Sequence, residues 1–80
     1  MKTYITATET ASFEAFKTSS KDRVSIIECS SLPAAVHVFY LATGTTTYRD
    51  VTLSTKKPNL DNNILDVDVM NSDDFLLNNL

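Results

Sequence analysis

The residues best suited to acid–base or nucleophilic chemistry occur once each in this chain of 80 residues. His37 is the single histidine and Cys29 the single cysteine, so a Cys–His or Ser–His–Asp arrangement would have to use His37 as its base. A turn at residues 30–35 would bring the two side chains together across neighbouring strands. The simpler interpretation is a hydrogen-bonded sheet histidine and a buried thiol that acts as a small hydrophobic group. One histidine and one cysteine also lack the paired ligand spacing of a zinc site.

Paired carboxylates offer a second kind of chemistry. On a strand, Asp66 and Asp68 share a face with their Cα atoms roughly 7 Å apart, and such a pair can hold a hard cation through oxygen ligands. Asp61, Asp73 or Asp74 could complete the coordination. The glycine-bearing loop of an EF-hand is missing, and the chain has no Trp to form the sugar platform of a glycosidase. A small metal-binding protein that uses Asp66 and Asp68 therefore remains an alternative, and we expect no cofactor.

Phosphate chemistry is excluded by composition. Phosphate-binding loops need several glycines for the close approach of the backbone, and Gly44 is the only glycine. Nucleotide hydrolysis and dinucleotide-dependent redox chemistry are therefore not expected. Together with the single histidine and cysteine, this predicts that the chain is not an enzyme.

The net charge of −3 is distributed unevenly. Residues 1–57 hold all seven Lys and Arg against five Asp and Glu, a net charge of +2, whereas residues 58–80 hold five Asp and no basic residue. These five residues form what we call the acidic block: Asp61, Asp66, Asp68, Asp73 and Asp74. Its field repels phosphate backbones and attracts basic partners. It is either a solvated edge or a docking surface, and we expect no direct nucleic-acid binding because the basic residues are scattered.

Residue patterning predicts the elements that must position these groups. Alternation of apolar and polar residues indicates strands, Phe13 and Phe16 share a face of a short helix, and the hydroxyl of Ser72 can cap a last helix that contains Asp73 and Asp74. The predicted strands cover 2–7, 23–29, 45–55 and 64–70, and the predicted helices cover 11–17 and 73–80.

The segment 34–43 fits two structures. Pro33 before it and Gly44 after it are typical of a helix, but the run Val36–Tyr40 is β-branched and aromatic and the next segment is strand-like. We predict a strand, with Gly44 in a hairpin turn.

These elements predict an α+β fold: a small, mainly antiparallel sheet of about four or five strands with one or two short helices packed on one face. The length predicts a single globular domain, 1–80. No apolar run approaches the ~18 residues needed to span a bilayer, and polar, Thr-rich sequence after Met1 and Lys2 is unlike a signal peptide. We expect a soluble, cytoplasmic protein that does not bind membranes.

The function that remains is binding without chemistry. We expect a small protein-binding module that covers a surface of a larger partner, as an inhibitor or adaptor, for instance the basic groove of a nucleic-acid-handling protein. Phage-encoded anti-defence and host-takeover factors are often compact acidic α+β proteins of this length, and in a phage protein the location would be the host cytoplasm. The candidate partner-binding residues are Asp66, Asp68, Asp73, Asp74, Tyr48 and Tyr40. Strict alternation along 45–55 places Tyr48 on an exposed strand face with Thr46 and Thr52.

The alternative function is structural. Exposed sheet edges and the C-terminal segment 75–80, which is rich in Phe and Leu, could pair two copies in a homodimer or attach the chain to a larger complex. An assembly subunit of this kind would need no chemistry either.

Overall fold

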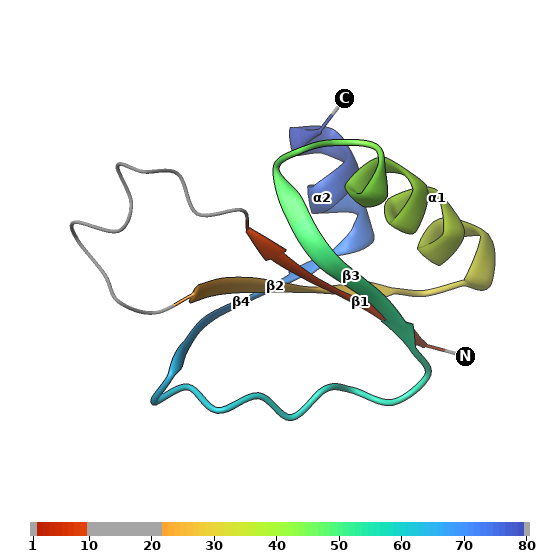
Figure 1. Cartoon of the computed structure of the whole chain (residues 1–80). Helices are drawn as coiled ribbons and strands as arrows, with labels where there is room; N and C mark the ends of the chain where they lie inside the picture. The colour runs from red at the N-terminus through yellow and green to blue at the C-terminus, as the bar shows by residue number, and fades with distance from the viewer. Residues whose placement is uncertain (1, 10–21, 80) are drawn as a thin grey trace.

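The computed structural model describes residues 2–9 and 22–79, in which four strands form one sheet and two helices lie on one of its faces (Figure 1). The predicted α+β fold is confirmed, and the helix predicted over 11–17 lies outside the described residues. The elements, in chain order, are β1 (Thr3–Glu9), β2 (Asp22–Cys29), α1 (Leu32–Thr43), β3 (Tyr48–Ser54), β4 (Leu65–Asn71) and α2 (Ser72–Asn78).

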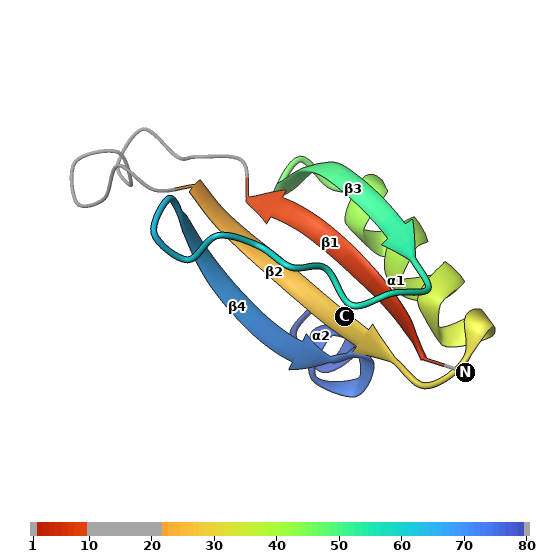
Figure 2. The same cartoon turned by 90° about the horizontal axis from the view of Figure 1, so that it is seen from below.

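The sheet is mixed, with strand order β3-β1-β2-β4. β1 is antiparallel to both of its neighbours, and β4 is parallel to β2. β2, β3 and β4 therefore all run in one direction, so the connections between them must cross the sheet. The first crossing is made by α1 over one face, and the second by residues 55–64 over the other (Figures 1 and 2).

Strand alternation gives each face its own apolar residues. Ile5 lies opposite Ile27 on the face that the helices cover, and Thr6 lies opposite Ile26 on the other face. The helix-side core combines the fully buried Ile5, Ile27 and Cys29 with small residues of α1 and with Phe75 of α2. Successive residues along 3–7 and 24–29 therefore point to opposite faces, as expected of the predicted strands.

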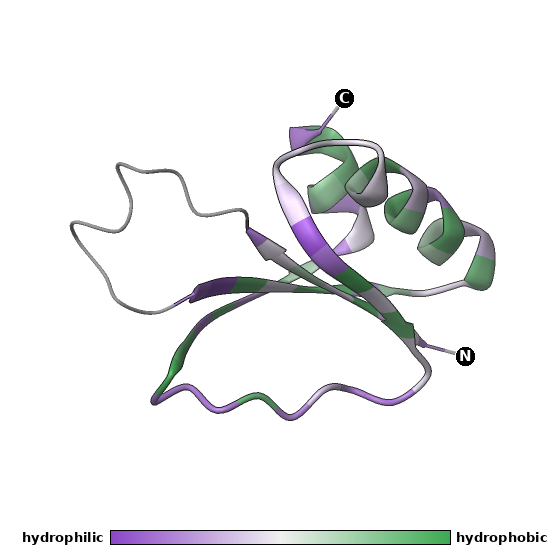
Figure 3. Cartoon of the chain, viewed as in Figure 1, coloured by the Kyte–Doolittle hydropathy of each residue, from purple (hydrophilic) through white to green (hydrophobic). Residues whose placement is uncertain are grey.

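The second face is covered by the connection 55–64. Tyr4, Val24 and Ile26 are buried on this face although neither helix lies on it. The connection runs beneath β1 and β2 in Figure 1 and passes in front of them in Figure 2, which is seen from below. Its Pro58 and Leu60 are half-buried. The connection is largely hydrophilic with short hydrophobic stretches (Figure 3), as expected of a segment with one side towards the sheet and one towards water.

The predicted strand over 34–43 is wrong, because this segment forms α1. The Ser31 hydroxyl accepts a hydrogen bond from the Ala34 N–H at 3.3 Å, and the Gly44 N–H donates to the Tyr40 carbonyl at 3.0 Å. Pro33 in the first turn costs no helical hydrogen bond. These end signals, together with burial of one helix face, outweigh the β propensity of the β-branched and aromatic run. Gly44 consequently ends a helix and makes no hairpin turn.

β3 contains a bulge that changes which side chains face the helices. Thr6 is opposite Thr52 and Thr8 is opposite Arg49, so β3 has one extra residue there, and Asp50 in this stretch has a φ of 52°. The strict alternation that we predicted for 45–55 therefore fails at Asp50. Tyr48, expected on an exposed face with Thr46 and Thr52, instead lies half-buried on the helix side.

α2 begins as predicted, but with a different cap. Asn71 provides the N-cap, its side-chain Oδ1 accepting from the Asp74 N–H at 2.8 Å, while Ser72 is buried in the first turn. Phe75 anchors the helix in the core, with its ring 5.8 Å from that of Tyr48. Asp73 and Asp74 occupy the first turn, where the helix dipole favours negative charge.

Candidate interaction surfaces

The outward face of α1 exposes a row of large apolar side chains. Leu32, Val36 and Tyr40 are 59%, 56% and 72% exposed, and their spacing of four residues places them along one side of the helix. We call these three residues the α1 ridge. The whole helix, Leu32–Thr43, contains no Asp, Glu, Lys or Arg, so the ridge lies on an uncharged surface. Exposed apolar side chains are ordinary when scattered, but a row of them is typical of an interaction site.

α1 buries small residues completely and leaves three large ones exposed, while Phe39 and Leu41 are half-buried against the core. The positions buried against the sheet are Ala35, Val38 and Ala42, whereas the ridge presents Leu32 and Tyr40 to water. A helix selected only for stability would bury the larger side chains, because the free energy gained increases with the apolar area removed from water. Leu32, Val36 and Tyr40 therefore contribute little to stability through burial within this chain.

The acidic block lies on β4 and on the two segments that flank this strand. Asp66 and Asp68 lie on β4, pairing in register with Arg23 and Ser25 of β2 and therefore on the helix side of the sheet. Asp73 and Asp74 follow directly in α2. Asp61 precedes the strand in a turn, where its Oδ1 accepts a hydrogen bond from the Asn63 N–H at 2.9 Å. Four of the five carboxylates thus lie on two directly joined elements, β4 and α2.

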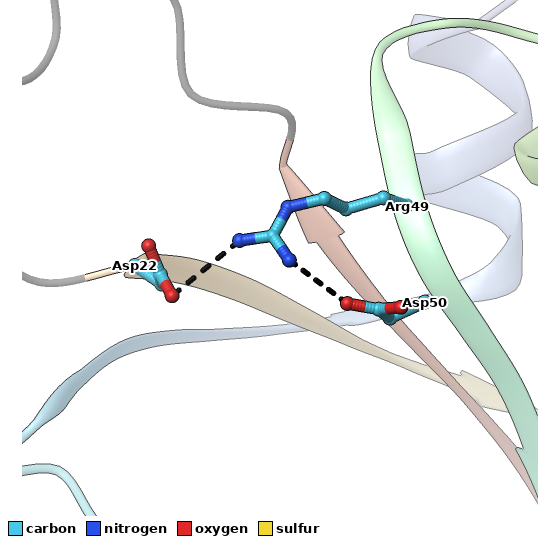
Figure 4. A network of polar contacts seen from close by, with 3 residues as sticks. All are labelled: Asp22, Arg49 and Asp50. Atoms are coloured by element: carbon cyan, nitrogen blue, oxygen red, sulfur yellow. Dashed lines mark hydrogen bonds and ion pairs between the residues drawn. The ribbon is translucent and has the colours of Figure 1, made fainter.

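Two arginines join the strands at one end of the sheet. Arg23 lies 3.9 Å from the carboxylates of both Glu9 and Asp68. Arg49 lies 3.4 Å from Asp22 and 2.9 Å from Asp50 (Figure 4). These partly exposed pairs contribute at most about 1 kcal/mol each.

Among the described residues, the ion pairs involve only part of the acidic block, namely Asp68. In the parts of the chain that are described, no ion pair reaches Asp66, Asp73 or Asp74. Asp66, Asp73 and Asp74 are all exposed, so a basic partner could reach them.

The two reactive side chains lie in different environments. Cys29 is completely buried; its thiol contacts the Ile27 carbonyl at 3.7 Å, and burial raises the pKa of the thiol, which keeps it protonated and unreactive. His37 is exposed on α1. The nucleophile and base that the single Cys and single His could have formed are not assembled.

A small hollow of about 180 Å³ lies where α2 begins. Three of its polar groups already bond within the fold: the Lys2 ammonium lies 3.1 Å from the Glu28 carboxylate, which raises the pKa of Lys2, and Asn71 caps α2. The hollow is lined by Lys2, Glu28, Cys29, Ser30, Asn71, Ser72 and Asp73.

Metal coordination receives no support from the geometry. Among the residues that the structure describes, no three His, Cys, Asp or Glu side chains gather where they could hold an ion. Asp66 and Asp68 share a strand face as predicted, but the other acidic residues do not complete a ligand set around them.

The predicted partner-binding residues are divided by the structure. Tyr40 is exposed on the α1 ridge, whereas Tyr48 packs against Phe75. Leu32 and Val36 were not predicted from the sequence as partner-binding residues. Their signal was the four-residue spacing with Tyr40 in an uncharged segment, which has meaning only once residues 32–43 are known to be helical.

Comparison of the chain with protein-family models, curated proteins and solved structures finds no match. Within the described ranges, neither helix has the length and apolar character needed to cross a membrane.

Proposed function

We propose that this chain is a non-catalytic protein-binding module that covers a surface of a larger protein, as an inhibitor or adaptor. The α1 ridge is the observation that supports this most strongly. Leu32, Val36 and Tyr40 form a row of apolar anchors on an uncharged helix, the pattern by which a helix fits into an apolar groove of its partner. Tyr adds a large contact area at low entropic cost, together with a hydroxyl for a hydrogen bond.

The acidic block would contribute to this binding through its charge. Asp66, Asp73 and Asp74 have no ion-pair partner among the described residues, so their field extends into solvent. Such a field attracts a basic partner and accelerates the encounter more than it strengthens the final complex. A partner with an apolar groove and basic surroundings would therefore match both features, and the groove of a nucleic-acid-handling protein is one example.

A cytoplasmic location is part of this proposal. The single thiol, Cys29, is free and buried, and a fold that uses no disulfide suits a reducing compartment. The partner would then be a cytoplasmic protein.

Photo-cross-linking from the ridge tests the proposal. Replacing Tyr40 with the photoreactive analogue p-benzoylphenylalanine keeps an aromatic ring at a position that is 72% exposed. After irradiation in an extract of the source cells, we expect one main adduct with a larger protein. The same analogue at Thr52, an exposed residue of β3 on the opposite face of the sheet, serves as the matched control and should give no such adduct.

The outcomes separate the two functional classes. An adduct of one chain with a second copy of itself would favour the alternative, an assembly subunit. Equal labelling from positions 40 and 52, or no adduct from position 40, would contradict a partner-binding ridge.

A further inference from the structure

The two edges of the sheet differ in regularity. β3, at one edge, is interrupted by the bulge at Asp50. β4, at the other edge, pairs with β2 through seven consecutive residues without a shift in register, and within the described chain no further strand lies beyond it. β4 therefore offers the more regular row of outward-facing N–H and C=O groups, which is a template for another extended chain.

The side chains of β4 alternate sharply between the two faces. Asp66 and Asp68 lie on the helix side, in register with Arg23 and Ser25. Val67 and Val69 lie on the other side, in register with Val24 and Ile26, and Val69 is 51% exposed. A strand added beside β4 would meet carboxylates on one face and apolar side chains on the other.

A second copy of β4 does not fit this edge well. If two copies paired in antiparallel fashion with their helices on the same side, Asp66 and Asp68 of one would face the same carboxylates of the other. Like charges directly opposite each other destabilise a strand pair. A strand with Lys or Arg at alternate positions would instead place an opposite charge beside each carboxylate.

We propose that the outer edge of β4 docks an extended segment of a partner protein in which Lys or Arg alternates with apolar residues. Backbone hydrogen bonds would provide the affinity, and the alternating side chains the register. The proposal rests on the proposed function only in that its occupant is a protein segment; the surface is separate from the α1 ridge.

The test uses the full ¹⁵N-labelled chain and the peptide acetyl-Thr-Lys-Val-Lys-Val-Lys-Thr-amide. We expect the largest amide shifts, and slower amide exchange, in residues 65–71. A peptide of the same composition with its lysines adjacent should bind much more weakly. A peptide methylated at alternate backbone nitrogens should also bind much more weakly, because the methylated peptide lacks N–H donors along one edge. Both controls leave the protein unchanged.

A pair of charge variants locates the contact. Asp66→Asn with Asp68→Asn should weaken binding about tenfold, since two opposite-charge cross-strand pairs are lost. Asp73→Asn with Asp74→Asn removes the same charge from α2 and should weaken binding much less. The amide spectra report whether each variant is folded.

Three results would overturn the proposal: no binding of the alternating peptide at millimolar concentration, equal binding of the peptide with adjacent lysines, or equal weakening by both charge variants. None of them affects cross-linking from Tyr40, so a failure here is distinguishable from a failure of the proposed function.

Discussion

The thiol of Cys29 is held in the core between β2 and α1, where it is completely buried. Burial disfavours the thiolate and raises the pKa above its ordinary value of 9.0. The pKa of the thiol is therefore higher in the folded chain than in the unfolded chain. The contribution of the buried, neutral thiol to the free energy of unfolding is fully present below pH 9 and is lost as the pH rises through the folded pKa. The hydroxyl of Tyr48, whose pKa burial also raises, extends this loss above pH 10.

Thiol labelling checks the burial of Cys29. At pH 8, a water-soluble disulfide reagent should react with the native protein about a hundredfold or more slowly than with the urea-unfolded chain, because the fold must open first. The unfolded chain is the control for full reactivity. Native labelling within a few-fold of the unfolded rate would show that the thiol is accessible, and would reopen a chemical role for it.

Asp50 is the residue at which the strand pattern changes. Its φ of 52° lies in the left-handed region, which Asp tolerates better than most residues and which β-branched residues avoid. Strict alternation along 45–55 assigned Tyr48 to the exposed face. No local signal revealed the bulge, which depends on how β3 pairs with β1, so the placement of Tyr48 against Phe75 was not predictable from the sequence.

Substitution of Asp50 measures this backbone constraint. Asp50→Val should lower the free energy of unfolding by about 1–2 kcal/mol because a β-branched residue is strained at this φ, whereas Asp50→Gly, which accepts the same φ, should change it much less. Both variants lose the contact with Arg49. The difference between their free energies of unfolding therefore reports the backbone strain at position 50. Urea titration gives both values, and equal destabilisation would contradict the left-handed conformation.

α1 shows how a helix can override a strand-like sequence. Residues 36–40 favour a strand locally, yet β2 and β3 run parallel with β1 between them, so their connection has to cross the sheet. A hairpin at Gly44 could not make that connection, and a helix can. The strands were predicted correctly where polar and apolar residues alternate, because this pattern is typical of a sheet with two different faces. The ends of α1, by contrast, were visible in Pro33 and Gly44 but were outweighed by composition.

The N-cap of α1 is testable by a single change. Ser31→Ala removes the hydroxyl that accepts from the Ala34 N–H and should cost about 1 kcal/mol of stability. Ser30→Ala, at the exposed neighbouring position, is the matched control and should change stability by less than about 0.5 kcal/mol. Chemical denaturation followed by circular dichroism at 222 nm compares them. Equal effects would mean that Ser31 does not cap the helix.

The whole molecule is a sheet covered on both faces, with binding features on its outside. The helices protect one face and the connection 55–64 crosses the other (Figure 2). The α1 ridge and all of the acidic block except the half-buried Asp68 are exposed. Composition alone indicated the acidic block and the shortage of catalytic groups. The ridge was not predictable, because its residues share a face only when 32–43 is helical.

The size of the protein in an extract of its own cells tests the central claim most directly. We expect the chain to elute from a sizing column in a complex larger than a dimer of 8.9 kDa chains. Val36→Glu with Tyr40→Glu should return it to the monomer position, since two charges on the ridge oppose burial. Thr55→Glu with Asn59→Glu adds the same charge on the connection and should leave the complex intact. Elution of the unaltered chain as a monomer, or release by both variants alike, would contradict a protein that works through the α1 ridge.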